Sequence, residues 1–127
     1  MDTEAYFGAF APDATFIFHT ERQRVASTAD YRRMWADWMA DGWRVEGCTS
    51  SNQLIQLAGQ TAIFTHDVET EISVDGSRET LSERETIIFM ATADGAVTAI
   101  HEHLSPAPGT ESDTETGTSP TSERAAA

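Results

Sequence analysis

The stretch TAIFTHDVETEISVDGSRETLSERETIIFMATADG, Thr61–Gly95, consists of two long β-type runs, each closed by a turn. Val, Ile, Phe and Thr recur in both runs, and an Asp-Gly dipeptide follows each of them. Long strands joined by turns this short pair as antiparallel hairpins. The stretch therefore predicts the centre of an antiparallel sheet, with strands at residues 61–74 and 80–92.

Strand patterns continue on both sides of this centre. The run WRVEGCTSSNQLIQL, residues 43–57, predicts a preceding strand with a bulge near Gly47, and AVTAIHEHLS, residues 96–105, predicts the last one. Further upstream, ATFIFH at residues 14–19 alternates apolar side chains and predicts a separate strand.

Two helices are predicted before the four-stranded meander. Aromatic residues at helical spacing from Tyr6 to Phe10 indicate a first helix that ends before Pro12. STADYRRMWADWMADG indicates a second, capped by Ser27 or Thr28 and stopped at Asp41-Gly42. Its apolar stripe normally packs into a core, and in a cone-shaped domain it can also line a pocket. This order predicts an α+β fold in which helices pack on the concave face of a curved antiparallel sheet.

The composition divides the chain into a folding unit and a tail. Residues 1–105 contain the apolar runs, whereas residues 106–127 lack aromatic, Leu, Ile and Val residues. Such a segment cannot bury enough apolar surface to offset its ordering entropy, so a disordered, dispensable acidic tail is expected. The net charge is −13, of which the tail supplies −3 and the domain the remaining −10.

Charge and cysteine content restrict the function classes. A domain this acidic repels nucleic acid and anionic membranes, so neither is an expected partner. Cys48 is the only cysteine, which favours a reducing compartment. No window has the length and apolar character of a membrane span, and no signal pattern opens the chain. These features predict a cytoplasmic protein.

The segments YFGAFAPDATF, STADYRRMWADW, ERETIIF and the terminal HEHLS together resemble the SnoaL-like branch of the nuclear-transport-factor-2-like superfamily. This is the cone fold of ketosteroid isomerases, polyketide cyclases and scytalone dehydratase. The closing SERETIIFMATADGAVTAIHEHLSPAP also resembles the association (hub) domain of calcium/calmodulin-dependent kinase. The resemblance implies a further helix before Asp2, which this sequence does not show.

The resemblance also implies a pocket. Positions that line it in the hub domain match Val68, Ile87 and Leu104. Phe18 stands where ketosteroid isomerases carry their Asp base, and a phenyl ring cannot accept a proton, which argues against isomerisation with that residue as base. With strand alternation, the expected apolar pocket comprises Phe18, Tyr31, Trp35, Trp38, Phe64, Val68, Ile87, Phe89, Ile100 and Leu104.

Three titratable residues share the predicted pocket face: Glu102, His66 and Glu85. Burial in an apolar cone raises the pKa of a carboxyl and lowers that of an imidazole, which suits both for acid–base catalysis near neutral pH. The alternative is structural, with these groups near strand ends or paired with Arg84 and Arg78.

His101 and His103 lie two apart and therefore share one face of the last strand. A metal site needs a third ligand, and the nearby Arg84 opposes a cation, so no metal and no other cofactor are expected. We expect these histidines on the outer face, where apolar Ile63, Ile88 and Met90 need a cover that a homodimer would provide. If the strand parity is inverted, the two histidines become the acid–base candidates.

Two functions follow from this sequence. The first is a small-molecule enzyme of SnoaL-like type (isomerase, cyclase or dehydratase) that uses cofactor-free general acid–base catalysis on a small hydrophobic substrate. The second is a non-catalytic ligand-binding or oligomerisation module, since one fold hosts both. No glycine-rich phosphate loop occurs, and no Ser-His-Asp arrangement can be read from the sequence.

Overall fold

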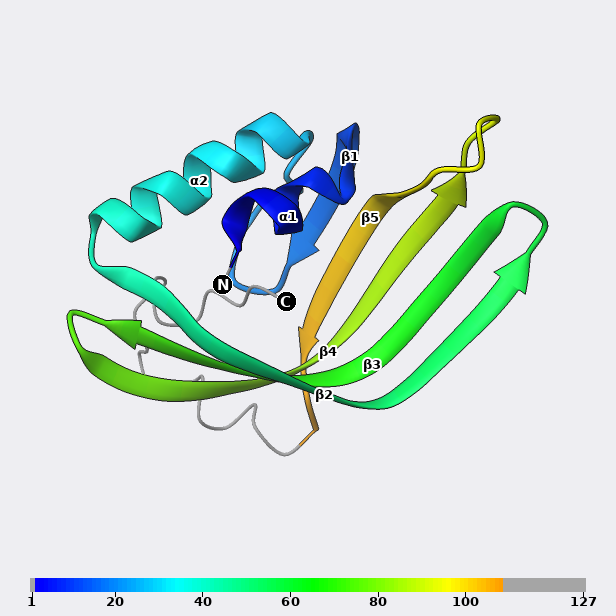
Figure 1. Cartoon of the computed structure of the whole chain (residues 1–127). Coiled ribbons are helices and arrows are strands. Elements are labelled where there is room, and N and C mark those ends of the chain that lie inside the picture. Colours follow the sequence, from blue (N-terminus) through cyan, green and yellow to red (C-terminus); the bar gives the residue numbers. More distant parts are fainter. Residues whose placement is uncertain (1, 109–127) are drawn as a thin grey trace.

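Five strands form one curved sheet in the computed structural model, which describes residues 2–108. The strand order across the sheet is β1-β5-β4-β3-β2. The strands are β1 (Phe10–Phe18), β2 (Trp43–Ala58), β3 (Thr61–Val74), β4 (Ser77–Ala91) and β5 (Val97–Pro106). Two helices, α1 (Thr3–Gly8) and α2 (Thr28–Ala40), lie together on the concave side of this sheet (Figure 1). The predicted α+β fold is confirmed.

The meander β2–β5 is antiparallel throughout, as its short turns require. The β1–β5 pair differs because it is parallel, with Phe18 opposite Leu104. A hairpin turn fixes the direction only of consecutive strands, and β1 is separated from β5 by α2 and the whole meander. The sequence pattern alone therefore did not reveal this pairing.

Helix α2 begins and ends at the predicted signals. The Ser27 hydroxyl accepts a hydrogen bond from the Asp30 N–H at 3.1 Å, which satisfies one of the unpaired donors of the first turn. The chain leaves the helix through Gly42, whose φ of 96° is left-handed. A Cβ atom there would come within 2.1 Å of Asp75 Oδ1, so any other residue would have to displace that carboxylate in addition to adopting the left-handed φ.

Helix α1 is shorter than its aromatic spacing predicts. It ends at Gly8, and Phe10 belongs to β1, where it pairs with Ala99 and is buried. Burial of Phe10 against the sheet outweighs the local helical pattern. Pro12 also lies inside β1, which tolerates it because an edge strand has backbone N–H groups without a partner strand.

The core fills the space between the helices and the sheet. Its centre is aromatic, with Phe7, Phe16, Tyr31, Trp35 and Trp43 all nearly inaccessible to solvent. The Trp35 and Trp43 rings meet edge to face at a centroid distance of 4.8 Å, a favourable aromatic geometry. The helices cover only part of the concave face, and the far end of the β2–β3 hairpin (green) extends beyond them (Figure 1).

Three register shifts within the meander β2–β5 set which of its side chains face inward. The register shift between Val45 and Gly47 confirms the predicted bulge. A second shift in β2 places Asn52 and Gln53 opposite the single residue His66. A third, in β5, pairs Phe89 with Ala99 and Ile88 with His101, so Ile100 is the extra residue. Because a bulge reverses strand alternation beyond it, each shift moves side chains from one face to the other.

Strand β5 continues to the boundary of the predicted tail. Pro106 pairs with Glu83, and the Ala107 N–H donates to the Ser82 carbonyl at 3.1 Å. The predicted disordered tail, residues 106–127, therefore begins with residues attached to β4. Its remaining part, residues 109–127, lies outside the described residues.

Candidate functional site

An apolar groove of about 250 Å³ opens on the concave face beside α1. It lies between the segment that contains Tyr6 and Phe10 and the inner face of strands β3, β4 and β5. Its apolar lining includes Phe64, Ile87 and Phe89, which are partly exposed, and its titratable lining is His66, Glu85 and Tyr6. Apolar walls around a few convergent polar groups are typical of small-molecule sites.

His66 and Glu85 form a directly bonded pair at one end of this groove. They lie opposite each other on β3 and β4, and His66 Nε2 is 2.5 Å from Glu85 Oε1. Glu85 is 2% exposed and His66 9%. The Phe64 ring lies over the His66 ring at a centroid distance of 4.5 Å. The pair is thus held in one orientation by strand register and by packing.

The other ring nitrogen of His66 is bonded to a serine. His66 Nδ1 lies 2.5 Å from Ser50 Oγ, and the Gln53 side-chain amide donates to the same hydroxyl at 2.8 Å. When Glu85 is ionised and His66 neutral, Nε2–H donates to Glu85, and Nδ1 accepts from the Ser50 hydroxyl. Ser50 and Gln53 are both exposed, so this chain of hydrogen bonds runs from the β2 surface to a buried carboxyl.

Burial shifts the two pKa values of the pair in opposite directions. Burial raises the pKa of Glu85; a hydrogen bond with Glu102 partly opposes this rise, and the neighbouring Glu83 carboxylate adds a smaller raising effect. Burial also lowers the pKa of His66, against smaller opposing effects of Asp67 and Glu102. A carboxyl and an imidazole whose pKa values approach each other can exchange a proton at little cost.

A second hydrogen-bonded group joins the helices to the sheet behind the groove. The Tyr6 hydroxyl donates to Glu102 Oε1 at 3.0 Å and lies 2.9 Å from the Tyr31 hydroxyl. Burial, and then the Glu102 charge, raise the pKa of Tyr6 well above its usual value. Tyr6 therefore keeps its proton at neutral pH. It lines the groove, whereas Glu102 is fully buried beneath it.

The structure distributes the ten predicted pocket residues over three locations. Phe64, Ile87 and Phe89 line the groove. Six others belong to the packed core or lie against it: Phe18, Tyr31, Trp35, Trp38, Val68 and Leu104. Ile100 is replaced on the inner face by Ala99, because the β5 bulge reverses alternation at that point. The aromatic stripe of α2 thus serves as a core face.

The acid–base candidates on the last strand also separate by face. Glu102 is fully buried on the inner face, while His101 and His103 lie on the other face, where His101 Nδ1 is 2.8 Å from Thr15 Oγ1. Burial, and then the His103 charge, lower the pKa of His101. Within residues 2–108, no three His, Cys, Asp or Glu side chains are grouped to hold a metal ion.

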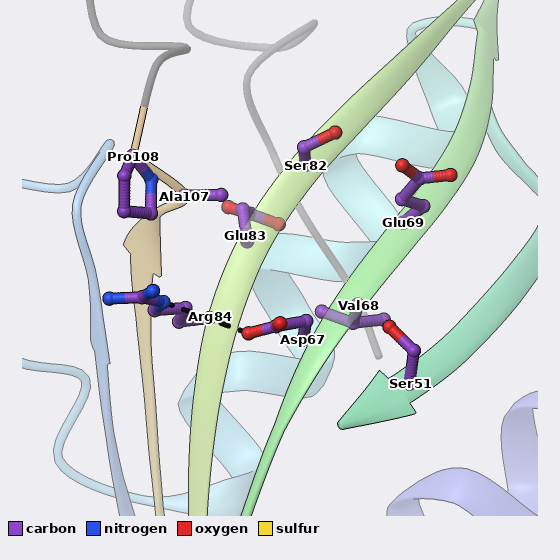
Figure 2. A pocket seen from close by; sticks show the side chains of 9 residues that line it. All are labelled: Ser51, Asp67, Val68, Glu69, Ser82, Glu83, Arg84, Ala107 and Pro108. Atoms are coloured by element: carbon purple, nitrogen blue, oxygen red, sulfur yellow. Dashed lines mark ion pairs between the residues drawn. The ribbon is translucent and has the colours of Figure 1, made fainter. Parts of the chain in front are cut away.

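A second depression, of about 370 Å³, has a polar lining that includes Asp67, Glu69, Ser82 and Arg84. It lies near the point where β5 ends, and Figure 2 shows Glu83 on β4 beside Ala107. Arg84 and Asp67 form an exposed ion pair across it at 3.6 Å. Glu83 itself is buried and bonded to His19 Nε2, whose side chain is 21% exposed.

Residues Ser50, Gln53 and Tyr6 were not predicted as site residues. Ser50 and Gln53 lie in a polar part of the predicted strand at residues 43–57, which has the pattern of a solvent-exposed edge strand. Tyr6 belongs to the aromatic pattern that predicts the first helix. The only sequence signal for Ser50 is its strand parity, and the bulge at Asn52–Gln53 reverses that parity.

The curved sheet, the helices on its concave face and the groove define a cone-fold protein of the nuclear-transport-factor-2-like class. A family model described as the SnoaL-like domain matches residues 1–109, and the chain belongs to this family. A search of curated protein sequences finds no match.

Solved structures share the fold at low sequence identity. A proposed ketosteroid isomerase from Parabacteroides distasonis superposes with a TM-score of 0.68 at 13% identity, covering 85% of this chain and 77% of its own. The CaMKII hub of S. rosetta gives 0.63 at 22% identity, covering 84% and 82%. A nuclear-transport-factor-2-like protein from Rhodospirillum rubrum gives 0.67 at 19%, covering 84% and 85%. Among the described residues, no helix is both long and apolar enough to span a bilayer.

Proposed function

We propose that the protein is a small-molecule enzyme that moves a proton on an apolar carbonyl substrate, as in an isomerase, cyclase or dehydratase. The observation that carries this proposal is the His66–Glu85 pair, buried and directly bonded at the end of an apolar groove. The family relation and the likeness to a proposed ketosteroid isomerase support the same reaction class.

His66 and Glu85 supply the acid and the base. In the form with Glu85 ionised and His66 neutral, the Glu85 carboxylate accepts the substrate proton, because burial raises its pKa, and the N–H of neutral His66 is the proton donor. No cofactor is needed for proton transfer between carbon and oxygen of an enolisable ketone. Glu102 acts indirectly, by holding the Tyr6 hydroxyl at the groove wall.

The groove limits the substrate. Its volume of about 250 Å³ lies below the range of about 300–1,000 Å³ for drug-sized ligands. It suits a compact apolar ketone, or the reactive end of a larger one whose remainder extends along the uncovered β2–β3 hairpin. The exposed Ile55 and Leu57 of β2 provide apolar surface in that direction.

The test is deuterium incorporation α to the carbonyl of cyclic enones and β,γ-unsaturated ketosteroids, followed by NMR in deuterated buffer. Ligands that bind the groove, detected by perturbed Phe64 and Phe89 resonances, should exchange with the native protein and not with Glu85→Gln. Binding without any exchange above the buffer rate would exclude the proposed catalysis.

A second candidate function, an oligomerisation module, is favoured by the exposed apolar side chains of the sheet. On the outer face, Leu54 is 55% exposed and Met90 is 38% exposed. Patches of this kind mark association surfaces. The likeness to the CaMKII hub supports assembly as well. We propose a homodimer through the outer face that carries Ile63, Ile88 and Met90.

Sedimentation at micromolar concentration tests this assembly. The native chain should sediment as a dimer, and Ile88→Asp, which introduces a charge into the proposed interface, should yield monomer. Thr80→Asp, on the exposed part of β4, provides a control that should not change the sedimentation coefficient. A native chain that is only monomeric at these concentrations would refute the dimer.

A further inference from the structure

The hydrogen-bonded row Ser50–His66–Glu85 crosses three neighbouring strands of the sheet, β2, β3 and β4. Its order is an exposed hydroxyl, an imidazole and a buried carboxylate. Both distances are 2.5 Å, so the imidazole bridges the two oxygens through its two nitrogens. A base that contacts the hydroxyl and is itself oriented by an acid is the arrangement that activates a serine.

We infer that Ser50 is a nucleophile for acyl transfer, and that small carboxylic esters are its substrates. This activity is distinct from the proposed proton transfer on ketones, although it rests on the same His66–Glu85 pair. The proposal depends on three features of the β2 edge that a merely structural serine does not need.

The first feature is access. Ser50 is exposed on the edge strand, so an ester carbonyl can approach Oγ without displacing a buried group. His66, in contrast, is 9% exposed and Glu85 2%, so the base and its carboxylate are shielded from water. The proposed nucleophile is therefore accessible to substrate, while the shielded Glu85 carboxylate fixes the tautomer of the His66 imidazole.

The second feature is the bulge directly opposite His66. Asn52 has a φ of 52°, a left-handed conformation that costs energy in residues other than glycine. The bulge places two residues of β2 opposite His66 and turns the Gln53 side chain back onto Ser50 Oγ. Asn52 Nδ2 contacts Asp67 Oδ2 at 3.4 Å, which ties the bulge to β3. Bulges commonly re-aim side chains in this way beside active sites.

The third feature is a donor for the developing negative charge. A carboxamide nitrogen carries two N–H bonds, and Gln53 Nε2 lies 2.8 Å from Ser50 Oγ. The same group can therefore donate to the oxygen of a carbonyl attacked by Oγ. Side-chain amides serve as oxyanion donors in acyl transfer.

The reaction follows from these contacts. Ser50 Oγ forms a bond to the ester carbonyl carbon while its proton passes to His66 Nδ1. The Glu85 carboxylate accepts a hydrogen bond from Nε2–H of the resulting imidazolium and stabilises its charge. The bond between the carbonyl carbon and the leaving oxygen then breaks, and Nδ1 returns the proton to that oxygen. Water attacks the acyl-serine through the same base, which releases the carboxylic acid and restores the Ser50 hydroxyl. The net reaction is hydrolysis of an ester to an acid and an alcohol.

A fluorophosphonate probe and p-nitrophenyl acetate test this inference on the full chain. We expect one phosphonate per chain, located at Ser50 in the tryptic fragment of residues 45–78, and release of p-nitrophenolate above the rate in buffer. Ser50→Ala removes the nucleophile, so it should abolish labelling of this fragment and lower p-nitrophenolate release by at least about 100-fold. Ser51→Ala is the matched control, since Ser51 is also exposed and lies opposite Asp67 on the other face.

Two results would overturn the inference. One is labelling that is absent, or located away from Ser50, in a protein whose His66 ring signals show the native fold. The other is equal labelling of the native chain and of Glu85→Gln, since a serine that reacts without the buried carboxyl is not activated by it. Ketone exchange and probe labelling are measured on the same native preparation. Exchange without labelling at Ser50 would overturn only this inference, and labelling at Ser50 without exchange would overturn only the proposed proton transfer.

Discussion

Two His–Glu pairs start from residues two apart on β4, yet their surroundings differ. Glu83 bonds His19, whose side chain is 21% exposed, while Glu85 bonds His66, whose side chain is 7% exposed. Only the second pair lines the apolar groove and continues to a serine. The same two residue types satisfy a buried carboxyl at the sheet's end in one pair and lie at the end of an apolar groove in the other, where we propose that they react. Solvent access to the histidine and the neighbouring apolar walls make the difference.

The largest expected difference between the pairs is in turnover. His66→Gln and Glu85→Gln should each reduce α-proton exchange of a groove-binding ketone by about 10²- to 10⁴-fold, because each removes one partner of the proton transfer. His19→Gln and Glu83→Gln serve as matched controls and should change the rate by less than about threefold. Equal losses of exchange rate in the variants of both pairs would contradict the proposal that the pair in the groove carries out the proton transfer.

Stability should separate the pairs next. His66→Ala leaves the buried Glu85 without its donor, which costs about 1–3 kcal/mol of unfolding free energy. His19→Ala should cost less, because water can replace a partly exposed imidazole next to Glu83. Urea denaturation of both variants measures the two costs. A larger loss of unfolding free energy in His19→Ala than in His66→Ala would contradict the conclusion that the His66–Glu85 pair is the one better shielded from water.

The pH dependence of stability gives a smaller, signed effect at Glu85. Its folded-state pKa is raised above the ordinary value of 4.5, so the folded state binds more protons than the unfolded state between these two values. Unfolding free energy contributed by this group is therefore present below pH 4.5 and falls as pH rises toward the folded-state pKa. Glu85→Gln cannot ionise and removes that fall.

The measurement is the difference in unfolding free energy between Glu85→Gln and the native chain, taken at several pH values. It should shift in favour of the variant as pH rises above 4.5. His66 contributes a slope of opposite sign below its ordinary pKa of 6.5, and the subtraction reduces it because both proteins contain this residue. A difference that is flat, or that shifts toward the native chain, would contradict the raised pKa of Glu85.

The smallest expected effect comes from the chain end that follows the Glu83 pair. Pro106 pairs with Glu83, and Ala107 bonds Ser82, so a deletion must spare both. Removing residues 109–127 should leave the Tm unchanged within error, because that composition offers no apolar surface to bury. A clear fall in Tm would show that this segment packs against the domain, and loss of the His19 signal would locate it at that pair.

Sequence patterns alone determined much of this architecture. Long strands with short turns required an antiparallel meander, and the spacing and capping of residues 28–40 required an amphipathic helix. Alternation also placed His66, Glu85 and Glu102 on the buried face, since each strand segment between bulges keeps a period of two. These are local regularities, which a short window of residues is sufficient to specify.

Tertiary structure decided the rest. A bulge changes the face of the sheet on which the following side chains lie, and no short sequence pattern marks its position. If the register at the β2–β3 turn continued along β2 without the bulge at Asn52–Gln53, the Ser51 side chain would face inward and that of Ser50 outward. The bulge in β5 likewise exchanges Ile100 for Ala99 at the groove. The parallel pairing of β1 and the end of α1 at Gly8 depend on contacts with β5, far along the chain. Residues distant in sequence settle such choices through packing, so only the folded chain reveals that Ser50, His66 and Glu85 meet.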